Sequence, residues 1–328
     1  MRRLILCVAM LVVLAAPGQL PAASFQGLGF LPGGNSSQAF GVSGDGLVIV
    51  GDATTQGFRW TAQTEMVELV GGGISDVSYD GSVIVGGGGR WTADTGWVDL
   101  GYLFVPDDEV YPEAVSPDGS VVVGKCEDQA FRWTAQTGMV DLGPASTPGE
   151  TGAARGVSAD GSVIVGDPGL WTADTGWTDI GGWCADVTPD GSVAVGLHGR
   201  WTAQTGWVSL GLLPGHNWTY PSAVSADGQV VVGFSMSDTG QEAFLWTADM
   251  GIRNLEDVLT NDFGLDLGYW DFEEATDVSA DGTVIVGFGN SNGTQAFRAV
   301  IPEPSSFAML GAGVVALLLV IRRKRCSS

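Results

Sequence analysis

Short apolar runs separated by polar turns recur along most of this chain, and residues 114–143 contain one complete unit of the pattern. A first strand ends at a Pro-Asp-Gly turn at 117–119, and the following run, 121–123, is apolar throughout, which predicts a strand buried on both faces. An alternating strand around Trp133 and a last strand near Gly143 are joined by a Thr-Gly turn. The unit therefore predicts four antiparallel strands whose faces are covered by neighbouring units.

The same unit occurs seven times. Its Asp-Gly turn recurs with a mean period of about 39 residues, within the range of four-stranded propeller blades. A second element, Trp-Thr-Ala, follows the turn in six units, and the seventh unit has Ala-Phe-Arg-Ala at 296–299. The turns begin at Asp45, Asp80, Asp118, Asp160, Asp190, Asp227 and Asp281.

The two ends of the repeated region complement each other. The seventh unit stops after its third strand, near Ile301, whereas residues 25–29 resemble the fourth strand of a unit. An N-terminal strand can complete the last sheet and remove two exposed sheet edges. We therefore predict an all-β fold, a single seven-bladed β-propeller of four-stranded repeats over residues 24–301, with the ring closed by the N-terminal strand.

The units also resemble the bacterial extracellular repeat family called HAF. The resemblance rests on Asp-Gly-Ser-Val-Ile-Val-Gly, Ala-Phe-Arg-Trp-Thr-Ala and Gly-Trp-Val-Asp-Leu-Gly, as in 80–101 and 118–143, and it spans roughly 25–300. Some copies depart from it, with Gly-Arg-Trp at 89–91 and Gly-Leu-Trp at 169–171. The resemblance implies secretion and surface association and no assigned reaction.

Residues 1–23 have the features of a secretory signal peptide. A basic start is followed by an apolar run from Leu4 to Ala16, which is short for a membrane span, and then by small residues. Cleavage after Ala23 and cleavage after Ser24 both fit the sequence. We expect this segment to be removed on export.

The C-terminal segment, 302–328, carries a second address. Pro302, Glu303 and Pro304 precede an apolar stretch at 307–321, which spans about 22 Å as a helix, less than a bilayer core of about 30 Å. An ordinary anchor is one reading, but the order resembles the PEP-CTERM sorting signal of Gram-negative bacteria. That resemblance implies cleavage by an exosortase after a transient inner-membrane stage, then display at the cell surface or in the extracellular matrix. The basic end consists of Arg322, Arg323, Lys324 and Arg325.

The charge is strongly acidic between the two addresses. The segment 24–301 holds eight basic residues against 36 acidic ones, a net charge of −28. Nucleic-acid binding needs clustered Lys and Arg, so this class of partner is excluded. Charged residues make up only 16 % of the chain, and 51 residues are glycine, which excludes a coiled coil or a solvated disordered chain.

Cysteine and histidine are scarce. Cys126 and Cys184 remain after removal of both addresses, and they lie in repeats that are not neighbours. An oxidising compartment permits a disulfide, and two free thiols are the alternative. The histidines, His198 and His216, show no spacing typical of a zinc site.

Three units begin like an oxygen-ligand loop for calcium. They read Asp-x-[Ser/Thr]-x-Asp-Gly and start at Asp76, Asp186 and Asp277. No acidic residue follows at the distal position that an EF-hand loop uses. We favour turns in which an Asp side chain caps its own backbone, and keep calcium as the alternative. No other cofactor is indicated.

The other repeated side chains are expected to be structural. The Trp of Trp-Thr-Ala recurs where packing between blades would repeat, so we assign it to the core. The Arg before it, as in Arg59, Arg90, Arg132 and Arg200, is expected to pair with acids at the surface or between blades. No Ser/His/Asp order or nucleophile elbow is visible, so the sequence does not predict an enzyme.

Loop variation gives the candidate binding face. The turns between strands one and two and between three and four are short and regular, whereas the other two connections share the opposite face and vary in length. Variable loops on a regular scaffold are where binding residues concentrate. The candidates are Tyr102, Phe104, Asp107, Asp108, Tyr111, Trp218, Tyr220, Trp270 and Phe272.

These features together predict an exported binding or structural module. Aromatic rings beside carboxylates suit sugar rings and hydroxyls, and they suit protein partners equally. We expect contact with extracellular polysaccharide or with a surface protein. The alternative is a hydrolase or lyase acting on extracellular glycans, which rests on fold analogy alone.

Overall fold

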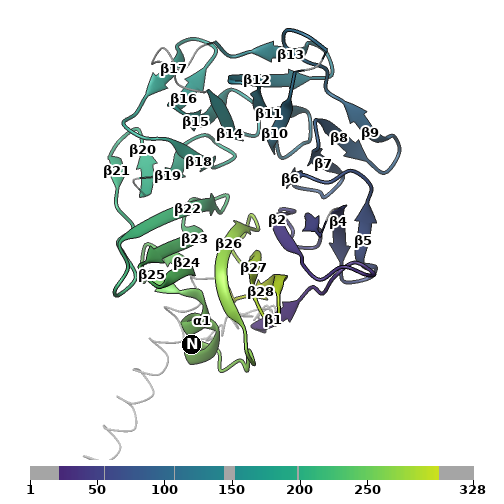
Figure 1. Cartoon of the computed structure of the whole chain (residues 1–328). Coiled ribbons are helices and arrows are strands. Elements are labelled where there is room, and N and C mark those ends of the chain that lie inside the picture. Colours follow the sequence, from purple (N-terminus) through teal and green to yellow (C-terminus); the bar gives the residue numbers. More distant parts are fainter. Residues whose placement is uncertain (1–21, 55, 107, 144–151, 198, 303–328) are drawn as a thin grey trace, which may run out of the picture.

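Seven four-stranded antiparallel sheets form a closed ring in the computed structural model (Figure 1). The structure describes residues 22–54, 56–106, 108–143, 152–197 and 199–302. Each sheet is one blade, and the first strands of successive blades contact one another around the centre. The predicted seven-bladed propeller is therefore confirmed.

The blades are numbered in chain order. Blade 1 contains β2 (Gln38–Val42), β3 (Ile49–Ala53), β4 (Gln56–Thr61) and β5 (Glu65–Leu69). Blade 2 contains β6 (Ile74–Val77), β7 (Val83–Gly86), β8 (Gly89–Thr92) and β9 (Gly96–Asp99). Blade 3 contains β10 (Val110–Val115), β11 (Val121–Cys126), β12 (Gln129–Thr134) and β13 (Gly138–Asp141).

Blades 4 to 7 complete the ring. Blade 4 contains β14 (Ala153–Val157), β15 (Val163–Asp167), β16 (Gly169–Thr172) and β17 (Gly176–Asp179). Blade 5 contains β18 (Cys184–Val187), β19 (Val193–Gly196), β20 (Gly199–Thr202) and β21 (Gly206–Val208). Blade 6 contains β22 (Trp218–Val224), β23 (Val230–Ser237), β24 (Gly240–Thr247) and β25 (Gly251–Asn254), followed by α1 (Leu255–Asp257) and the π-helical turn η1 (Val258–Asp262). Blade 7 contains β26 (Asp271–Val278), β27 (Val284–Asn290), β28 (Thr294–Val300) and β1 (Ser24–Gly27).

The N-terminal strand closes the ring as predicted. β1 pairs antiparallel with β28, from Ser24 opposite Val300 to Gly27 opposite Phe297. The Phe25 ring lies 5.0 Å from Trp270 and 5.2 Å from Phe272, measured between ring centroids. The last sheet is thus built from both ends of the propeller.

Every Asp-Gly turn has the same internal hydrogen bonds. In blade 3, Asp118 Oδ1 accepts from the Ser116 hydroxyl at 2.7 Å and from the Ser120 amide at 2.9 Å. Gly119 has a φ of +72°, and a Cβ on it would lie 2.5 Å from a Val83 methyl of the preceding blade, so glycine is required on two grounds. The predicted turn, in which an Asp side chain caps its own backbone, is therefore correct for the second Asp of each suspected calcium loop: Asp80, Asp190 and Asp281.

The repeated Trp is less buried than predicted. Trp60 is buried, but the other five are half-buried at the blade interfaces, where Trp171 donates its indole N–H to the Leu142 carbonyl of the preceding blade at 3.1 Å. A fully buried ring stands two residues before the Trp in three blades, as Phe58, Phe131 and Phe244, and Phe297 occupies the same position in blade 7, which lacks the Trp. The reason is the alternation of the third strand, because residues two apart share a face but reach different depths.

The repeated Arg bridges blades, but its partner is not an acid. Arg90 Nε donates to the Gly119 carbonyl at 3.2 Å, and Arg200 Nε donates to the Gly228 carbonyl at 3.1 Å. Each acceptor belongs to the Asp-Gly turn of the next blade. The expected pairing with carboxylates is therefore corrected to a bond with the backbone of that turn.

Both propeller cysteines are free and buried. Cys126 lies in β11 and Cys184 in β18, and no disulfide joins them. Of the two open alternatives, the structure has free thiols. No helix among the described residues is long and apolar enough to cross a membrane. The apolar stretch 307–321 and most of the predicted signal peptide lie outside the described residues.

Candidate functional site

A cavity lies near the centre of the ring, on the face of the variable loops, and is called the channel mouth below. The innermost strands of blades 3 to 7 contribute its lining, and the cavity has a volume of about 290 Å³. The residues that face it stand two or four positions before the Val that ends each of these strands. The polar and aromatic residues of this channel mouth are Glu113, Arg155, Trp183, Tyr220, Ser222 and Glu274.

Aromatic rings form one wall of the channel mouth. Tyr220 is stacked on Phe234, with 4.9 Å between ring centroids and 17° between planes. The Arg155 guanidinium lies 5.8 Å from the centre of the Trp183 ring, at the distance of a cation–π contact. Stacked and cation-capped rings are held in place, so they give a ligand a fixed apolar surface.

Carboxylates lie beside these rings. Burial raises the pKa of Glu274 to about 7, against the opposing effect of the Ser222 hydroxyl, which donates to Glu274 Oε1 at 3.3 Å. Glu113 lines the same cavity from blade 3. At neutral pH, Glu274 can therefore accept or donate a hydrogen bond, depending on its proton.

Three further carboxylates lie on the inner strands below the channel mouth. Asp76 and Asp186 each accept an amide N–H from the next blade, at 2.9 Å from Val115 and at 2.9 Å from Val224 respectively. Burial raises the pKa of Asp76 to about 7 and that of Asp186 to about 6. For Asp277, burial and then the charge of Asp76 raise the pKa well above its usual value. These carboxylates join blades.

Two of the predicted binding residues share a groove away from the channel. Tyr102 and Asp108 line a cavity of about 590 Å³ between blades 2 and 3, together with Trp97. Phe104 and Tyr111 are exposed nearby, and Lys125 Nζ lies 4.9 Å from the centre of the Tyr111 ring. Asp107 lies outside the described residues.

The remaining predicted residues divide between the channel mouth and the core. Tyr220 lines the channel mouth, and Trp218, two residues before it on β22, has 60 % of its surface exposed. Phe272 is only 2 % exposed, and half-buried Trp270 packs against the same cluster. The placement of Phe272 on the binding face is wrong, because its ring packs against Phe25 under the closing strand.

Five of the six residues given above for the channel mouth were not among the candidate binding residues: Glu113, Arg155, Trp183, Ser222 and Glu274. A signal for them exists in the sequence. They occupy the positions two and four before the Val of each first strand, where blade 2 has the small residues Ser75 and Gly73. Long variable loops gave no sign of them, because these residues lie in the first strands or directly next to them.

His216 and the residues of the suspected calcium loops are not among the described residues that line the channel mouth. His216 Nε2 lies 3.6 Å from Glu242 Oε2, and His198 lies outside the described residues. In the part of the chain that the structure describes, no group of three or more His, Cys, Asp or Glu side chains is placed to hold a metal ion. The first and second Asp of each suspected calcium loop serve separate hydrogen-bond systems, as in Asp76 and Asp80.

Comparison with known proteins identifies the C-terminal address. Residues 300–324 match the PEP-CTERM protein-sorting motif, which confirms that part of the sequence prediction and implies export and surface sorting. Apart from Pro302, the predicted processing residues lie outside the described part of the chain. No curated protein matches the sequence.

Solved structures share the propeller fold at low identity. An oligogalacturonate lyase from Vibrio parahaemolyticus is 14 % identical, with a TM-score of 0.55 over 88 % of this chain and 99 % of the lyase chain. An oligogalacturonate lyase in complex with manganese is also 14 % identical, with a TM-score of 0.51 and the same coverage. At this identity the likeness extends to the fold alone. The chain is thus an all-β seven-bladed propeller that carries a PEP-CTERM sorting motif.

Proposed function

We propose that the exported propeller binds an extracellular polysaccharide at the channel mouth. The observation that supports this best is the convergence of Trp183, Tyr220, Arg155 and Glu274 from four blades on one concave cavity. A sugar presents apolar ring faces and hydroxyl edges, and these match aromatic surfaces beside charged hydrogen-bonding groups. Sorting to the surface would place this cavity among such polymers.

The shape of the cavity favours a sugar over a protein partner. A specific protein interface typically buries roughly 800 Å² on each side and is broadly flat. The channel mouth is instead a small hollow that one or two sugar rings would fill. Its rings are already fixed by the Tyr220–Phe234 stack and by Arg155, so binding would cost little ordering.

Export, processing by an exosortase and HAF-type repeats are the further parts of the proposal. The PEP-CTERM match supports sorting by an exosortase, and the seven Asp-Gly units support the relation of the blades to HAF repeats. The two addresses flank the propeller directly. Processing at both would therefore release the ring without adding to it or removing a strand from it.

A second candidate function is cleavage of the bound glycan by a hydrolase or lyase mechanism. A carboxyl group with a pKa of about 7, such as Glu274, can exchange protons with a substrate near neutral pH. Arg155 and Glu113 lie in the same cavity. Both solved structures compared above are named oligogalacturonate lyases, so turnover is tested alongside binding.

The test is a glycan array on the propeller, residues 22–302, which contains all seven complete sheets. Trp183→Ala should abolish binding, because it removes both a ring surface and the contact of Arg155. Trp218→Ala is the matched control, since this exposed ring lies outside the cavity and should leave binding unchanged. Retained binding in Trp183→Ala would contradict the proposed site.

Turnover is followed on the same glycans by release of new reducing ends and of unsaturated products. Binding without turnover supports the binding module. Turnover that is lost in Glu274→Gln while binding persists would instead support the enzyme.

A further inference from the structure

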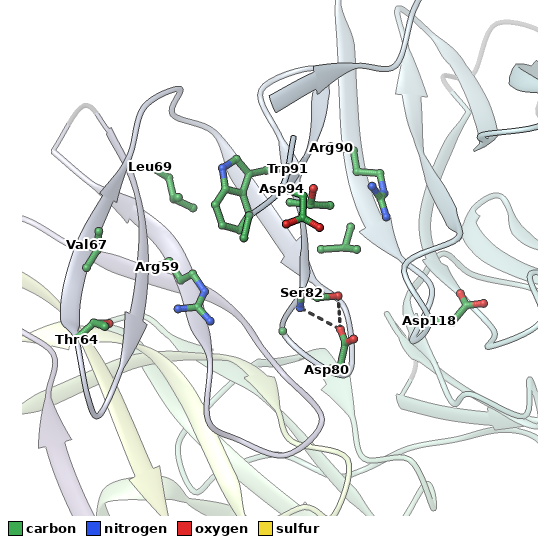
Figure 2. Close-up of a pocket in the computed structure, with 14 residues that line it drawn as sticks. Arg59, Thr64, Val67, Leu69, Asp80, Ser82, Arg90, Trp91, Asp94 and Asp118 are labelled. Atoms are coloured by element: carbon green, nitrogen blue, oxygen red, sulfur yellow. Dashed lines mark hydrogen bonds between the residues drawn. The ribbon is translucent and has the colours of Figure 1, made fainter. Parts of the chain in front are cut away.

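Two similar grooves lie between blades on the face of the regular turns, opposite the channel mouth. One separates blades 1 and 2 and has a volume of about 740 Å³, and the other separates blades 3 and 4 and has a volume of about 680 Å³. Figure 2 shows the first, with Arg59 and Val67 on one side and Trp91 and Asp94 on the other.

The two grooves carry the same side chains at equivalent repeat positions. Arg59, Val67 and Trp91 of the first groove correspond to Arg132, Val140 and Trp171 of the second. Each groove also has the Asp of its Asp-Gly turn and an Asp directly after Trp-Thr-Ala, which is Asp94 in the first and Asp174 in the second. The same polar and aromatic set is therefore presented twice on one face.

The Arg side chains of the grooves do not form ion pairs with the groove carboxylates: among the ion pairs of the described residues, none joins Arg59 or Arg132 to such a carboxylate. Arg132 Nε instead donates to the Gly161 carbonyl of the next blade at 3.4 Å. Asp94 and Asp174 are exposed, and the two Val side chains are also exposed, at 47 % for Val67 and 45 % for Val140. A cation, a carboxylate and a half-buried indole thus face one open space.

An alternation around the ring sets these grooves apart from the other blade interfaces. The residue after Trp-Thr-Ala is Asp in the even blades and Gln in the odd blades up to blade 6. The two sets are Asp94, Asp174 and Asp249, and Gln63, Gln136 and Gln204. Blades 5 and 6 therefore repeat the same combination a third time, with Arg200, Val208, Trp246 and Asp249.

The turn itself does not require this alternation. The flanking Thr hydroxyls are 2.8 Å apart in the Gln turn of blade 1 (Thr61 to Thr64) and 2.8 Å apart in the Asp turn of blade 2 (Thr92 to Thr95). Both residue types are exposed there and fit the same backbone. The choice of Asp in the grooves therefore calls for an explanation outside the fold.

We infer that these two grooves, together with the interface of blades 5 and 6 that carries the same side chains, are three equivalent binding sites for a neutral polysaccharide. Sugar hydroxyls both donate and accept, so they can bond Arg and Asp in one groove, while a ring face packs on the indole and Val. The cavity volumes lie within the range of small-ligand sites, about 300–1,000 Å³. The net charge of −28 between the two addresses would repel a uronate polymer, which selects a neutral chain.

Three equal sites on one rigid face suit a polymer of repeating units. Once one groove is occupied, the next sugar segments of the same chain are held near the other two grooves, so the apparent affinity for the polymer exceeds that for a short oligosaccharide. This inference goes beyond the proposed function, because these grooves lie on the other face from the channel mouth and involve none of its residues.

The test exchanges the two natural turn types in the full chain, held in a mild detergent. Asp94→Gln, the double variant with Asp174→Gln and the triple variant with Asp249→Gln should fold, because Gln already occupies the same turn in three blades. Gln136→Asp is the matched control, with a turn exchange outside the three grooves. Thermal unfolding of each variant verifies the fold.

Binding is measured by calorimetry with manno-, cello- and xylohexaose, and with polygalacturonate as the anionic comparison. We expect one neutral hexaose to titrate the wild type with three groove sites, and the stoichiometry to fall by one with each Asp→Gln exchange. Affinity for the corresponding polymer should fall by about tenfold or more for each lost site, as expected when avidity is reduced. Gln136→Asp should not lower either value.

The outcomes separate this inference from the proposed function. Trp183→Ala at the channel mouth should leave the three groove sites intact, so failure of the channel mouth would not affect them. The inference is overturned if no neutral hexaose binds, if the triple variant keeps the wild-type stoichiometry, or if only polygalacturonate binds. Arg59→Gln gives an independent check, because it should remove one site and leaves the sequence of every turn unchanged.

Discussion

The carboxylate of Asp277 in the last blade accepts a hydrogen bond from the backbone amide of Val42 in the first blade, at 2.7 Å across 235 positions of sequence. Its other oxygen accepts from the Val278 amide of its own strand at 2.7 Å. One side chain thus joins the two blades at the seam of the ring.

Asp277→Ala should destabilise the propeller by about 1–3 kcal/mol, because it leaves a buried N–H of Val42 without a partner. Asp277→Asn keeps an acceptor and should cost less. Urea denaturation measures both. Asp186→Ala is the control, because it removes the equivalent bond to Val224 between blades 5 and 6, away from the seam. Only Asp277→Ala should speed amide hydrogen exchange in β1. Equal exchange rates in the two variants would contradict a role of Asp277 at the seam.

The closing strand is expected to be essential for stability. Deleting residues 24–30 would expose the edge of β28 that pairs with β1 and remove Leu28 from the core, so we expect aggregation or a large fall in the unfolding midpoint. The milder Phe25→Ala should cost about 2–4 kcal/mol through loss of its contacts with Trp270 and Phe272. An unchanged midpoint in the deletion would mean that closure does not need β1.

Stability should depend on pH in two opposite ways. The raised pKa values of Asp76, about 7, and Asp186, about 6, mean that the folded state holds these protons more tightly than the unfolded state does. Their contribution to stability therefore grows as pH falls from about 7 to the ordinary Asp pKa of 3.8, and it is lost as pH rises through the same range. The turn carboxylate Asp160, whose pKa hydrogen bonds with Ser162 lower to about 2, contributes stability that is lost as pH falls toward 2.

We therefore expect the urea midpoint to be highest at about pH 4, close to the ordinary pKa of Asp, and lower both at pH 8 and at pH 2. The triple variant Asp76→Asn, Asp186→Asn, Asp277→Asn should flatten the fall in the midpoint between about pH 4 and pH 8 and leave the fall below pH 4 in place. A wild-type midpoint that rises from pH 5 to pH 8 would contradict the assignment of these carboxylates.

The two propeller thiols should resist modification in the folded state. Both are buried, and burial raises the pKa of Cys184 to about 12 and also raises that of Cys126. We expect no labelling of residues 22–302 by iodoacetamide at pH 8, and two labels after denaturation, counted by mass spectrometry. Rapid labelling without denaturant would show that these blades open.

Processing at the C-terminus is expected to depend on the Pro-Glu-Pro sequence. Replacement of Pro302, Glu303 and Pro304 by alanine should leave the longer chain in the inner membrane of a host with an exosortase, because the apolar segment 307–321 remains. The wild type should instead end near 301–304. Intact mass spectrometry decides between them, and a mature wild type that retains Arg322 to Arg325 would indicate a simple anchor.

The blades were predictable because their signals are local. An Asp-Gly turn such as Asp118-Gly119 fixes its own geometry through bonds within five residues, and seven copies give the blade count directly. Closure was also predictable, since a missing fourth strand and a spare first strand can be counted. These features do not depend on side-chain packing across the ring.

The channel mouth could not be predicted in the same way. Glu113, Arg155 and Ser222 stand at positions where the first strand shifts register against the second, and a shift of one residue decides whether a side chain faces the channel. Phe272 illustrates the opposite error. Its place in a variable, acidic segment suggested exposure, whereas the closing strand covers it.

The position of β28 has a mechanical consequence for a chain attached through its C-terminus. Tension applied beyond Pro302 reaches β28 first, and this strand lies between β27 and β1 rather than at a sheet edge. An edge strand could be peeled away one hydrogen bond at a time, but extracting β28 requires breaking two ladders together. A pulling force at the C-terminus therefore acts on a strand that is paired on both sides. The N-terminal strand β1 and the C-terminal strand β28 would resist such a force together.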